Sequence, residues 1–411
     1  TVSTGDWQEV MKAGSTLFLG YDQTSAEIRI TRYRKTLEKK KTSYHLVFDQ
    51  TPFYAESGGQ IGDTGLIEKG DEKIRILDTQ KEHNLIIHIT DQLPVDPKGL
   101  FMATVDQEKR LNTTFHHTST HLLHHALREV LGKHVEQKGS LVHPDYLRFD
   151  FSHFQKVEDE ELDRVEKLVN RLIREDHPRE ESRSIAMKDA MDMGAIAFFG
   201  EKYGDQVRVI KFGESVELCG GVHVTSTGNI GFLKIVRESA IAAGIRRIEA
   251  VAGPAAERYV DQGFEILKKI ESTFKTTNVL ATIEKTLLEN TALKKLRDEF
   301  SRDLRSIARD NLISRIRKAR HINLIAEEIP MRTADDFKSL AFELKSQVEN
   351  MVLVLGGDLN GKAHLTIMIS ESIVKDLSLD ARQLIREVSA DIQGGGGGQD
   401  FYATAGGKNP G

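Results

Sequence analysis

The chain has 411 residues, of which 39% are hydrophobic and 29% are charged, and its formal net charge is −5 at pH 7. This length predicts roughly two to four domains. Its apolar runs are far shorter than a membrane span and nothing at its start resembles a signal peptide, so we expect no association with a membrane. A single cysteine excludes an internal disulfide and fits a reducing cytoplasm, and the negative charge means that any contact with RNA must come from local patches.

The first segment, residues 1–105, has the patterns of a β-rich domain. Apolar and polar residues alternate at 26–33 and 73–77, and a short apolar run covers 44–48, as in strands. Glycines interrupt the pattern between 58 and 65, where turns or close backbone approaches are expected. A basic stretch at 29–41 is better explained as a solvated hairpin tip than as a contact for RNA.

The second segment, residues 106–254, reads as mixed α/β. The spacing of apolar residues predicts helices at 118–130 and 159–175, the second ended by Pro178. Strand patterns occur at 147–151, 207–212, 231–236 and 245–251.

Four residues of this segment form a candidate metal site. Cys219 and His223 make a Cys-x-x-x-His segment, and His117 and His121 make a His-x-x-x-His segment about a hundred residues upstream. Residues four apart share one face of a helix, and one thiolate with three imidazoles suits Zn²⁺. A lone cysteine is also often just a small buried apolar residue, so spacing alone leaves metal binding and packing equally open. Thr118 follows His117, which excludes the His-Glu-x-x-His motif of metalloproteases.

The last two segments differ in kind. Residues 255–321 repeat apolar positions at three-and-four spacing, which predicts a helical pair or a short coiled coil. Residues 322–411 read as strand, helix, strand, strand, helix, followed by five glycines at 394–398. Such a run is either a flexible linker or a backbone cradle for phosphate.

Motifs along the whole chain follow the order and spacing of a known family. They are 50–65 (QTPFYAESGGQIGDTG), 117–124 (HTSTHLLH), 137–142 (QKGSLV), 147–153 (LRFDFSH), 194–204 (GAIAFFGEKYG), 219–223 (CGGVH), 244–250 (GIRRIEA), 394–398 (GGGGG) and 405–408 (AGGK). The set resembles the editing and C-terminal domains of alanyl-tRNA synthetases. One departure is Val222, where that family usually has threonine.

The patterns and the resemblance together predict an α+β multidomain protein. We expect a barrel-like β-rich part at 1–105, a zinc-containing α/β editing core at 106–254, a helical coiled-coil arm at 255–321 and a small α/β C-terminal domain at 322–411. The chain starts at Thr1 and stops soon after the glycine run. We therefore expect a piece of a longer protein, with the ATP-using aminoacylation domain upstream and the last domain incomplete.

The resemblance also implies an activity and its residues. It implies hydrolysis of the ester in tRNA(Ala) mischarged with serine or glycine, in the cytoplasm, by part of an alanine–tRNA ligase that cannot aminoacylate on its own. Zn²⁺ would be held by His117, His121, Cys219 and His223, and four protein ligands favour an organising role for it. Gln137 and Thr120 would contact the substrate, Gly58, Gly59, Gln60 and Asp63 would shape a nearby wall, and Lys408 would grip phosphate beside the glycine run.

A second hypothesis is a non-catalytic fragment. It would bind tRNA, carry a structural zinc and form a homodimer through the helical arm and the C-terminal domain. Loss of the ester from Ser-tRNA(Ala) incubated with the chain would distinguish the two.

Overall fold

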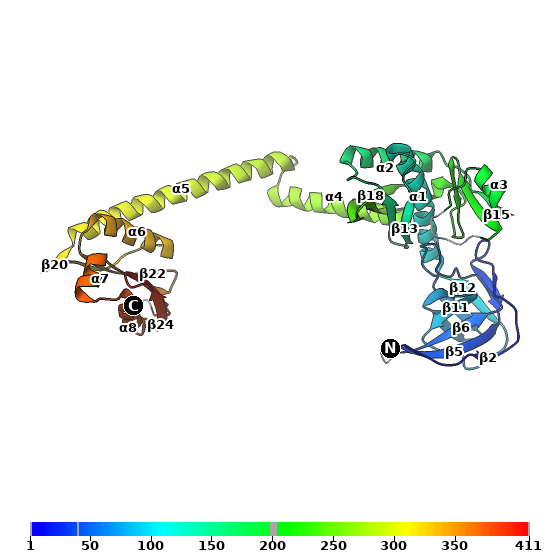
Figure 1. Cartoon of the computed structure of the whole chain (residues 1–411), viewed down its shortest axis with the longest axis horizontal. Helices are drawn as coiled ribbons and strands as arrows, with labels where there is room; N and C mark the ends of the chain where they lie inside the picture. Colours follow the sequence, from blue (N-terminus) through cyan, green and yellow to red (C-terminus); the bar gives the residue numbers. More distant parts are fainter. Residues whose placement is uncertain (1, 39–40, 198–203, 410–411) are drawn as a thin grey trace. The chain divides into compact units, whose positions relative to one another are not determined.

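The computed structural model describes residues 2–38, 41–197 and 204–409, which form two compact units, Thr1–Lys269 and Ile270–Gly411. The fold is mixed α+β, with eight α-helices and several small β-sheets among these residues (Figure 1). Within the described ranges, no helix is both long enough and apolar enough to cross a membrane.

The N-terminal part of the first unit is built from two β-sheets. One contains β1 (Val2–Thr4), β2 (Gln8–Glu9), β5 (Ile30–Glu38), β6 (Lys41–Phe48), β10 (Asp78–Glu82) and β11 (Leu85–Thr90). The other has the order β4 (Ser25–Ile28), β12 (Phe101–Val105), β8 (Gly65–Lys69), β9 (Glu72–Ile76), and β3 (Leu17–Phe18) pairs separately with β7 (Gln50–Thr51). Residues of both sheets, including Phe48 and Phe101, share one core because the apolar side of each alternating strand turns inward.

The two sheets do not close into the predicted barrel-like shape. Their described ladders have open ends, with β1 and β10 at the ends of one path and β4 and β9 at the ends of the other. The chain passes between the sheets at Arg29, between β4 and β5, and at Leu77, between β9 and β10. At Arg29 the backbone N–H donates to Asp49 Oδ1 at 2.7 Å instead of joining a ladder. The sheets are therefore joined by the continuous chain and a common core.

A completely buried histidine lies in this part, on β11. His88 Nε2 is 2.8 Å from Thr51 Oγ1, and its Nδ1 is 3.2 Å from the Leu46 carbonyl oxygen. Its ring also stacks on Phe48, with 3.8 Å between ring centroids. Burial lowers the pKa of His88 from 6.5 to about 3, because the protonated ring would lose its hydration.

Acid is therefore expected to destabilise this part of the protein. Below pH 6.5 the unfolded chain binds a proton at His88 that the folded chain binds only near pH 3, so the free energy of unfolding falls as the pH is lowered through this window. At pH 5 the loss from this residue amounts to about 2 kcal/mol. Urea unfolding at pH 7 and pH 5 should show a smaller drop in the His88→Gln variant than in the wild type. An equal drop in both would contradict the prediction.

The second part of the first unit places helices on an antiparallel sheet. The sheet order is β13 (Gln137–Val142), β14 (Leu147–Ser152), β19 (Ile245–Ala252), β18 (Leu233–Ala242). Helices α1 (Gln107–Leu131) and α2 (Asp159–Arg174) share a core with it. Beside it are β15 (Glu180–Ala186), α3 (Met187–Asp192), β16 (Gln206–Phe212), β17 (Ser215–Leu218) and a short 3₁₀ helix (Thr227–Ile230). Helix α4 (Pro254–Phe274) follows β19.

Helix α1 is longer than the sequence pattern predicts. It begins at Gln107, eleven residues before the predicted start, and Asp106 caps it by accepting a hydrogen bond from the Lys109 N–H at 3.1 Å. Its first half was missed because several of its buried residues are polar, so the apolar periodicity is absent. This half of α1 faces the β-rich part, where Arg110 forms a buried ion pair with Asp63.

The second unit contains helix α5 (Val279–Ser314) and a six-stranded sheet. The strand order is β20 (Arg317–Ala319), β21 (Ile322–Glu328), β22 (Met351–Asp358), β23 (Ala363–Ile369), β25 (Tyr402–Gly407), β24 (Gly394–Gly398). Helices α6 (Ala334–Gln347), α7 (Glu371–Leu377) and α8 (Ala381–Ser389) complete it. Separate apolar clusters join the sheet to α6 and to α8.

The five glycines form an edge strand rather than a flexible linker, and their predicted contact with phosphate stays a prediction. β24 pairs with β25 along its whole length, from Gly394 opposite Gly407 to Gly398 opposite Ala403. A Cβ at Gly396 would lie 2.5 Å from the Thr404 carbonyl oxygen, whereas one at Gly397 would meet nothing within 4 Å. Glycine is therefore needed at alternate positions by the close approach of β25.

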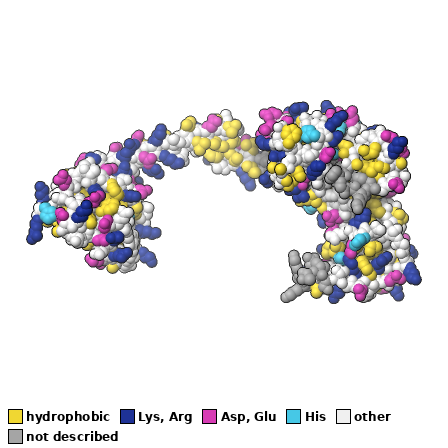
Figure 2. Space-filling view, in the orientation of Figure 1, with side chains coloured by type: hydrophobic (Ala, Val, Ile, Leu, Met, Phe, Trp, Pro, Cys, Tyr) yellow, Lys and Arg dark blue, Asp and Glu magenta, His cyan; other side chains and the backbone are white. Residues whose placement is uncertain are grey.

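Helix α5 carries large apolar side chains that the second unit does not cover. Figure 2 shows such side chains gathered on its N-terminal part. Leu280 is 75% exposed and Leu288 is 72% exposed, whereas Leu312 near the other end is buried against the sheet. The helix predicted here is present, and the predicted coiled coil stays a prediction.

Candidate metal centre and adjoining cavity

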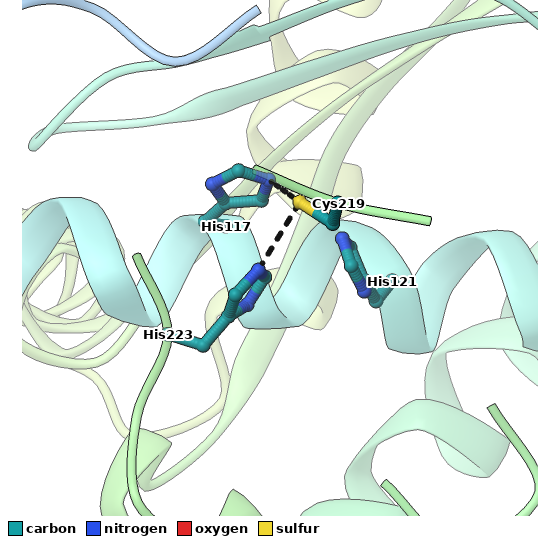
Figure 3. A group of neighbouring side chains, drawn as sticks. All are labelled: His117, His121, Cys219 and His223. Atoms are coloured by element: carbon teal, nitrogen blue, oxygen red, sulfur yellow. Dashed lines mark hydrogen bonds between the residues drawn. The ribbon is translucent and has the colours of Figure 1, made fainter. Parts of the chain in front are cut away.

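The four predicted ligand residues meet at one point of the first unit. His117 and His121 project from the same face of α1, and Cys219 and His223 flank the turn that follows β17 (Figure 3). Cys219 Sγ lies 3.3 Å from His117 Nε2 and 3.3 Å from His223 Nε2. One ligand atom from each of the four residues lies within 4.8 Å of all the others.

The three imidazoles are in the protonation state that a metal requires. Burial lowers the pKa of His117 and of His223 well below the usual value, and the charge that His121 would carry when protonated lowers both further. Burial also lowers the pKa of His121, against the opposing effect of Glu217. All three rings are therefore neutral at pH 7, with a lone pair available for a cation.

The residues present fit a zinc ion. Ligand atoms placed tetrahedrally at the usual Zn–N and Zn–S distances stand roughly 3.3–3.6 Å apart. The two sulfur–nitrogen distances of 3.3 Å are close to that range. His121 Nδ1 is buried and has no hydrogen-bond partner among the described residues. A buried polar atom without a partner lowers the stability of the fold, so this nitrogen is available to bind a metal ion. Three neutral imidazoles and one sulfur match the donor set that zinc prefers.

Buried polar groups surround the ligands. Gln60 Oε1 lies 2.7 Å from His117 Nδ1, and Thr118 Oγ1 lies 3.1 Å from His223 Nδ1. The Glu217 carboxylate lies 3.3 Å from His121 Nε2 and 2.8 Å from His124 Nδ1. Such outer contacts orient ligand side chains before a metal binds.

The turn that carries Cys219 is held by side chains from two other segments. Arg208 donates to the carbonyl oxygens of Cys219 at 2.8 Å and Gly221 at 2.6 Å. Tyr21 donates to the Gly220 carbonyl oxygen at 2.7 Å, and the Arg208 guanidinium lies 3.9 Å from the centre of its ring. The turn is therefore fixed on both sides, which favours a site formed in advance of its ligand.

A cavity of about 270 Å³ opens next to the ligand cluster. Its lining includes three of the four ligand residues, His117, His121 and Cys219, together with the predicted substrate residues Gln137 and Thr120. The remaining described lining residues are Tyr54, Ser57, Gly58, Ser140, Gly204, Gln206, Val207, Arg208, Leu218, Gly220 and Gly221. Polar side chains and backbone thus converge beside the metal ligands, as expected for a small polar substrate.

Gln137 and Thr120 differ in the hydrogen bonds that they can still offer to a substrate in this cavity. Gln137 is half-buried, and its Nε2 donates to Ser140 Oγ at 3.3 Å. The Thr120 hydroxyl donates to the His116 carbonyl oxygen at 2.8 Å within α1, so it can offer a substrate only its acceptor capacity. Gln137 can therefore both donate to and accept from a substrate, whereas Thr120 can only accept.

Of the four residues predicted to form a wall near the substrate, only Gly58 lies in the lining of the cavity. Gly58 has a positive φ of 56°. Gly59 packs so closely on β13 that a Cβ would lie 2.2 Å from Ser140 Oγ. Gln60 and Asp63 do not line the cavity, since Gln60 contacts His117 behind it and Asp63 pairs with Arg110. The structure thus brings only part of the predicted wall to the cavity.

Two further predictions concern Lys408 and the motif at 194–204. Lys408 is exposed in the second unit, directly after Gly407, which pairs with Gly394. In the motif at 194–204, residues 198–203 lie outside the described residues.

Several residues beside the ligands were missed by sequence reasoning. Tyr21 and Arg208 have no motif spacing of their own, and the tertiary fold alone brings them to the cluster. Glu217 had a signal, because it lies two residues before Cys219 in the sequence. Ser140 had a signal, because it belongs to the same short motif as Gln137.

Three family models and several curated relatives match this chain. The family model described as "Threonyl and Alanyl tRNA synthetase second additional domain" matches residues 207–249, "tRNA synthetases class II (A)" matches 2–106, and "DHHA1 domain" matches 321–411. The alanine–tRNA ligase of Bacteroides fragilis is 50% identical over 411 residues, covering 100% of this chain and 47% of that protein. The chain belongs to the alanine–tRNA ligase family.

Other members of the alanine–tRNA ligase family give the same coverage. The Cytophaga hutchinsonii protein is 48% identical and the Flavobacterium psychrophilum protein 41% identical, each over 99% of this chain and 47% of the relative. The chain therefore spans about half the length of the curated relatives it matches. Among solved structures, the C-Ala domain from Aquifex aeolicus alanyl-tRNA synthetase matches with 25% identity and a TM-score of 0.22, over 23% of this chain and 85% of that chain.

The departure at Val222 is accommodated without loss of a backbone contact. Where the alanine–tRNA ligase family usually has threonine, the Val222 side chain is buried and its N–H donates to Gln60 Oε1 at 3.0 Å. Any residue with a backbone N–H can make this hydrogen bond, so the valine leaves it unchanged and removes only what a threonine hydroxyl would contact.

Proposed function

We propose that the chain is the editing part of an alanine–tRNA ligase, and that it hydrolyses the ester of tRNA(Ala) mischarged with serine or glycine. The terminal adenosine of the single-stranded CCA end would enter the cavity beside the metal ligands. A pocket selective for alanine cannot exclude the smaller glycine by size and rejects an added hydroxyl poorly, so a second hydrolytic site is needed for accuracy.

The observation that carries this proposal is the position of the cavity. Its lining combines three ligand residues with the side chains of Gln137, Ser140 and Thr120 in a volume of about 270 Å³. That volume suits a small aminoacyl group, and the polar lining suits its hydroxyl and ammonium groups. The membership of the chain in the alanine–tRNA ligase family supports the choice of tRNA(Ala) as the substrate carrier.

The side chains of the cavity have distinct roles in this proposal. A Zn²⁺ held by His117, His121, Cys219 and His223 would have a full set of protein ligands and would hold the cavity in shape. The Gln137 amide both donates and accepts hydrogen bonds, so it can orient the attacking water or the seryl hydroxyl. Thr120 Oγ1 would accept a hydrogen bond from the substrate, because its own proton is engaged by the His116 carbonyl oxygen.

The test is hydrolysis of Ser-tRNA(Ala) by the purified chain. Loss of the ester well above the spontaneous rate, with Ala-tRNA(Ala) lost much more slowly, supports editing. If both esters decay at the spontaneous rate, the chain does not edit.

One structural feature favours a second candidate function, a non-catalytic fragment that binds tRNA and self-associates. The exposed apolar side chains of α5 are suited to a helical partner, such as the same helix of a second copy. Homodimerisation through α5 and the C-terminal domain, combined with zinc binding but no ester hydrolysis, would support this alternative.

We further expect the second unit to strengthen tRNA binding without taking part in the chemistry. A shorter chain ending at Lys275 keeps the first unit and all of α4, and with them the whole ligand cluster. It should bind zinc and hydrolyse bound Ser-tRNA(Ala) at the full-length rate, while its Kd for whole tRNA(Ala) should rise about tenfold at physiological salt. An unchanged Kd would make the second unit a structural appendage.

A further inference from the structure

Gln60 is a completely buried residue that connects the β-rich part to two elements of the ligand cluster. We propose that Gln60 is a positioning residue: it places the proton of His117 on Nδ1 and so directs Nε2 toward the metal. This inference rests on the proposed metal site and assigns Gln60 a role through His117 rather than on the substrate.

The orientation of the Gln60 amide follows from its backbone partner. The Val222 N–H can only donate, and it lies 3.0 Å from the Gln60 side-chain atom assigned as Oε1. That atom must therefore be the oxygen, because an NH₂ group would oppose the N–H. A backbone donor thus removes the usual ambiguity between the two ends of a glutamine amide.

The same oxygen determines the tautomer of His117. Gln60 Oε1 lies 2.7 Å from His117 Nδ1, a distance that requires a proton between the two atoms. The amide oxygen carries no proton, so Nδ1 must donate and Nε2 keeps its lone pair. Nε2 is the nitrogen that lies 3.3 Å from Cys219 Sγ, on the side of the other ligands (Figure 3).

The turn after Cys219 is shaped to allow this contact. A Cβ at Gly221 would lie 2.0 Å from His117 Cε1 and 2.9 Å from Gln60 Oε1. The absence of a side chain at Gly221 therefore lets the turn, His117 and Gln60 pack together. Gln60 itself is anchored, since its N–H donates to the Ser57 carbonyl oxygen at 3.0 Å and it forms a β-bridge with Val142 on β13.

The experiment compares three variants of the full-length chain. Gln60→Met keeps the shape of the side chain but removes the hydrogen-bond acceptor, whereas Gln60→Glu keeps an acceptor for the N–H groups of Val222 and His117. Gln50→Met is the control, because it changes another glutamine of the β-rich part, one that donates to the Glu27 carbonyl oxygen. Labelled histidine, with the His117 signal identified by its loss in His117→Gln, reports the tautomer by NMR in metal-free protein. Transfer of zinc to a chromogenic chelator reports the dissociation rate.

We expect the wild type, Gln60→Glu and Gln50→Met to show His117 protonated on Nδ1 and to release zinc at similar rates. Gln60→Met should lose that single tautomer and release zinc about 10–100-fold faster, as for other outer contacts of metal ligands. A wild-type tautomer and zinc release rate in Gln60→Met would overturn the inference. If Gln60→Met does not fold, loss of the Nδ1–H signal in Gln60→Glu would overturn it.

The outcomes separate this inference from the function proposed above. A wild-type chain that binds no zinc would refute the metal site, while the tautomer of His117 in the metal-free chain would still show whether Gln60 places the proton on Nδ1. A wild-type chain that binds zinc but leaves Ser-tRNA(Ala) intact would refute editing and leave the assignment of Gln60 unaffected.

Discussion

Replacing Cys219 with alanine should remove bound zinc and reduce the hydrolysis of Ser-tRNA(Ala) by at least about 100-fold, which corresponds to about 2.7 kcal/mol. The thiol is the one sulfur in a cluster of three neutral imidazoles, and its Sγ lies 3.3 Å from two of their nitrogens. Without it, three buried nitrogens remain and the Gly221 N–H loses the sulfur that accepts from it at 3.3 Å. Elemental analysis should find about one zinc per wild-type chain and much less in the variant.

A matched control separates loss of the ligand from a general effect of mutation. His143 stacks on Tyr146 at a ring distance of 5.0 Å and does not belong to the ligand cluster. His143→Ala should keep both zinc and activity. Cys219→Ala protein with an unchanged zinc content would refute the assignment of Cys219 as a ligand.

Gln137→Ala should lower kcat for Ser-tRNA(Ala) about 100-fold while zinc stays bound. Gln137 lines the cavity and is not one of the four ligand residues, so its loss removes a positioning group and leaves the cluster complete. A misplaced water or ester can cost this much even when all other groups remain. Single-turnover hydrolysis and zinc analysis of the same preparation give the two quantities.

Gln80→Ala provides the control for Gln137. Gln80 lies on β10 and its Nε2 donates to Asp78 at 2.8 Å on an exposed surface. Hydrolysis in this variant should match the wild type. A Gln137→Ala variant that was equally active would remove Gln137 from the proposed site.

Local patterns were sufficient to predict most elements near the cavity. The alternation in 147–151 and 245–251 corresponds to β14 and β19, and the 159–175 pattern corresponds to α2, because these segments each present one apolar face to a shared core. In the second unit the predicted order of strand, helix, strand, strand, helix corresponds to β21, α6, β22, β23 and α8. The predicted domain boundaries at 105, 254 and 321 stay predictions.

Other features depend on long-range contacts that local patterns do not contain. The five glycines pair as a strand because β25 supplies the partner, although glycine itself disfavours strands. Gln60 was predicted to shape a wall beside the substrate, whereas its contact with His117 arises from a neighbour 57 positions away. Glu217 reaches α1 from β17 in the same way, through tertiary packing of two elements.

The ligand residues of the candidate metal centre come from two places in the sequence, since His117 and Cys219 are 102 positions apart. An ion bound by both would act as a reversible cross-link, closing a loop of about a hundred residues that contains every element from β13 to β17. For a covalent link, closing a loop of this length reduces the entropy of the unfolded chain by the equivalent of about 4.7 kcal/mol at 25 °C. Metal supply would then control how long the first unit survives, and a shortage of zinc would shorten the lifetime of a site whose shape is already set by the protein.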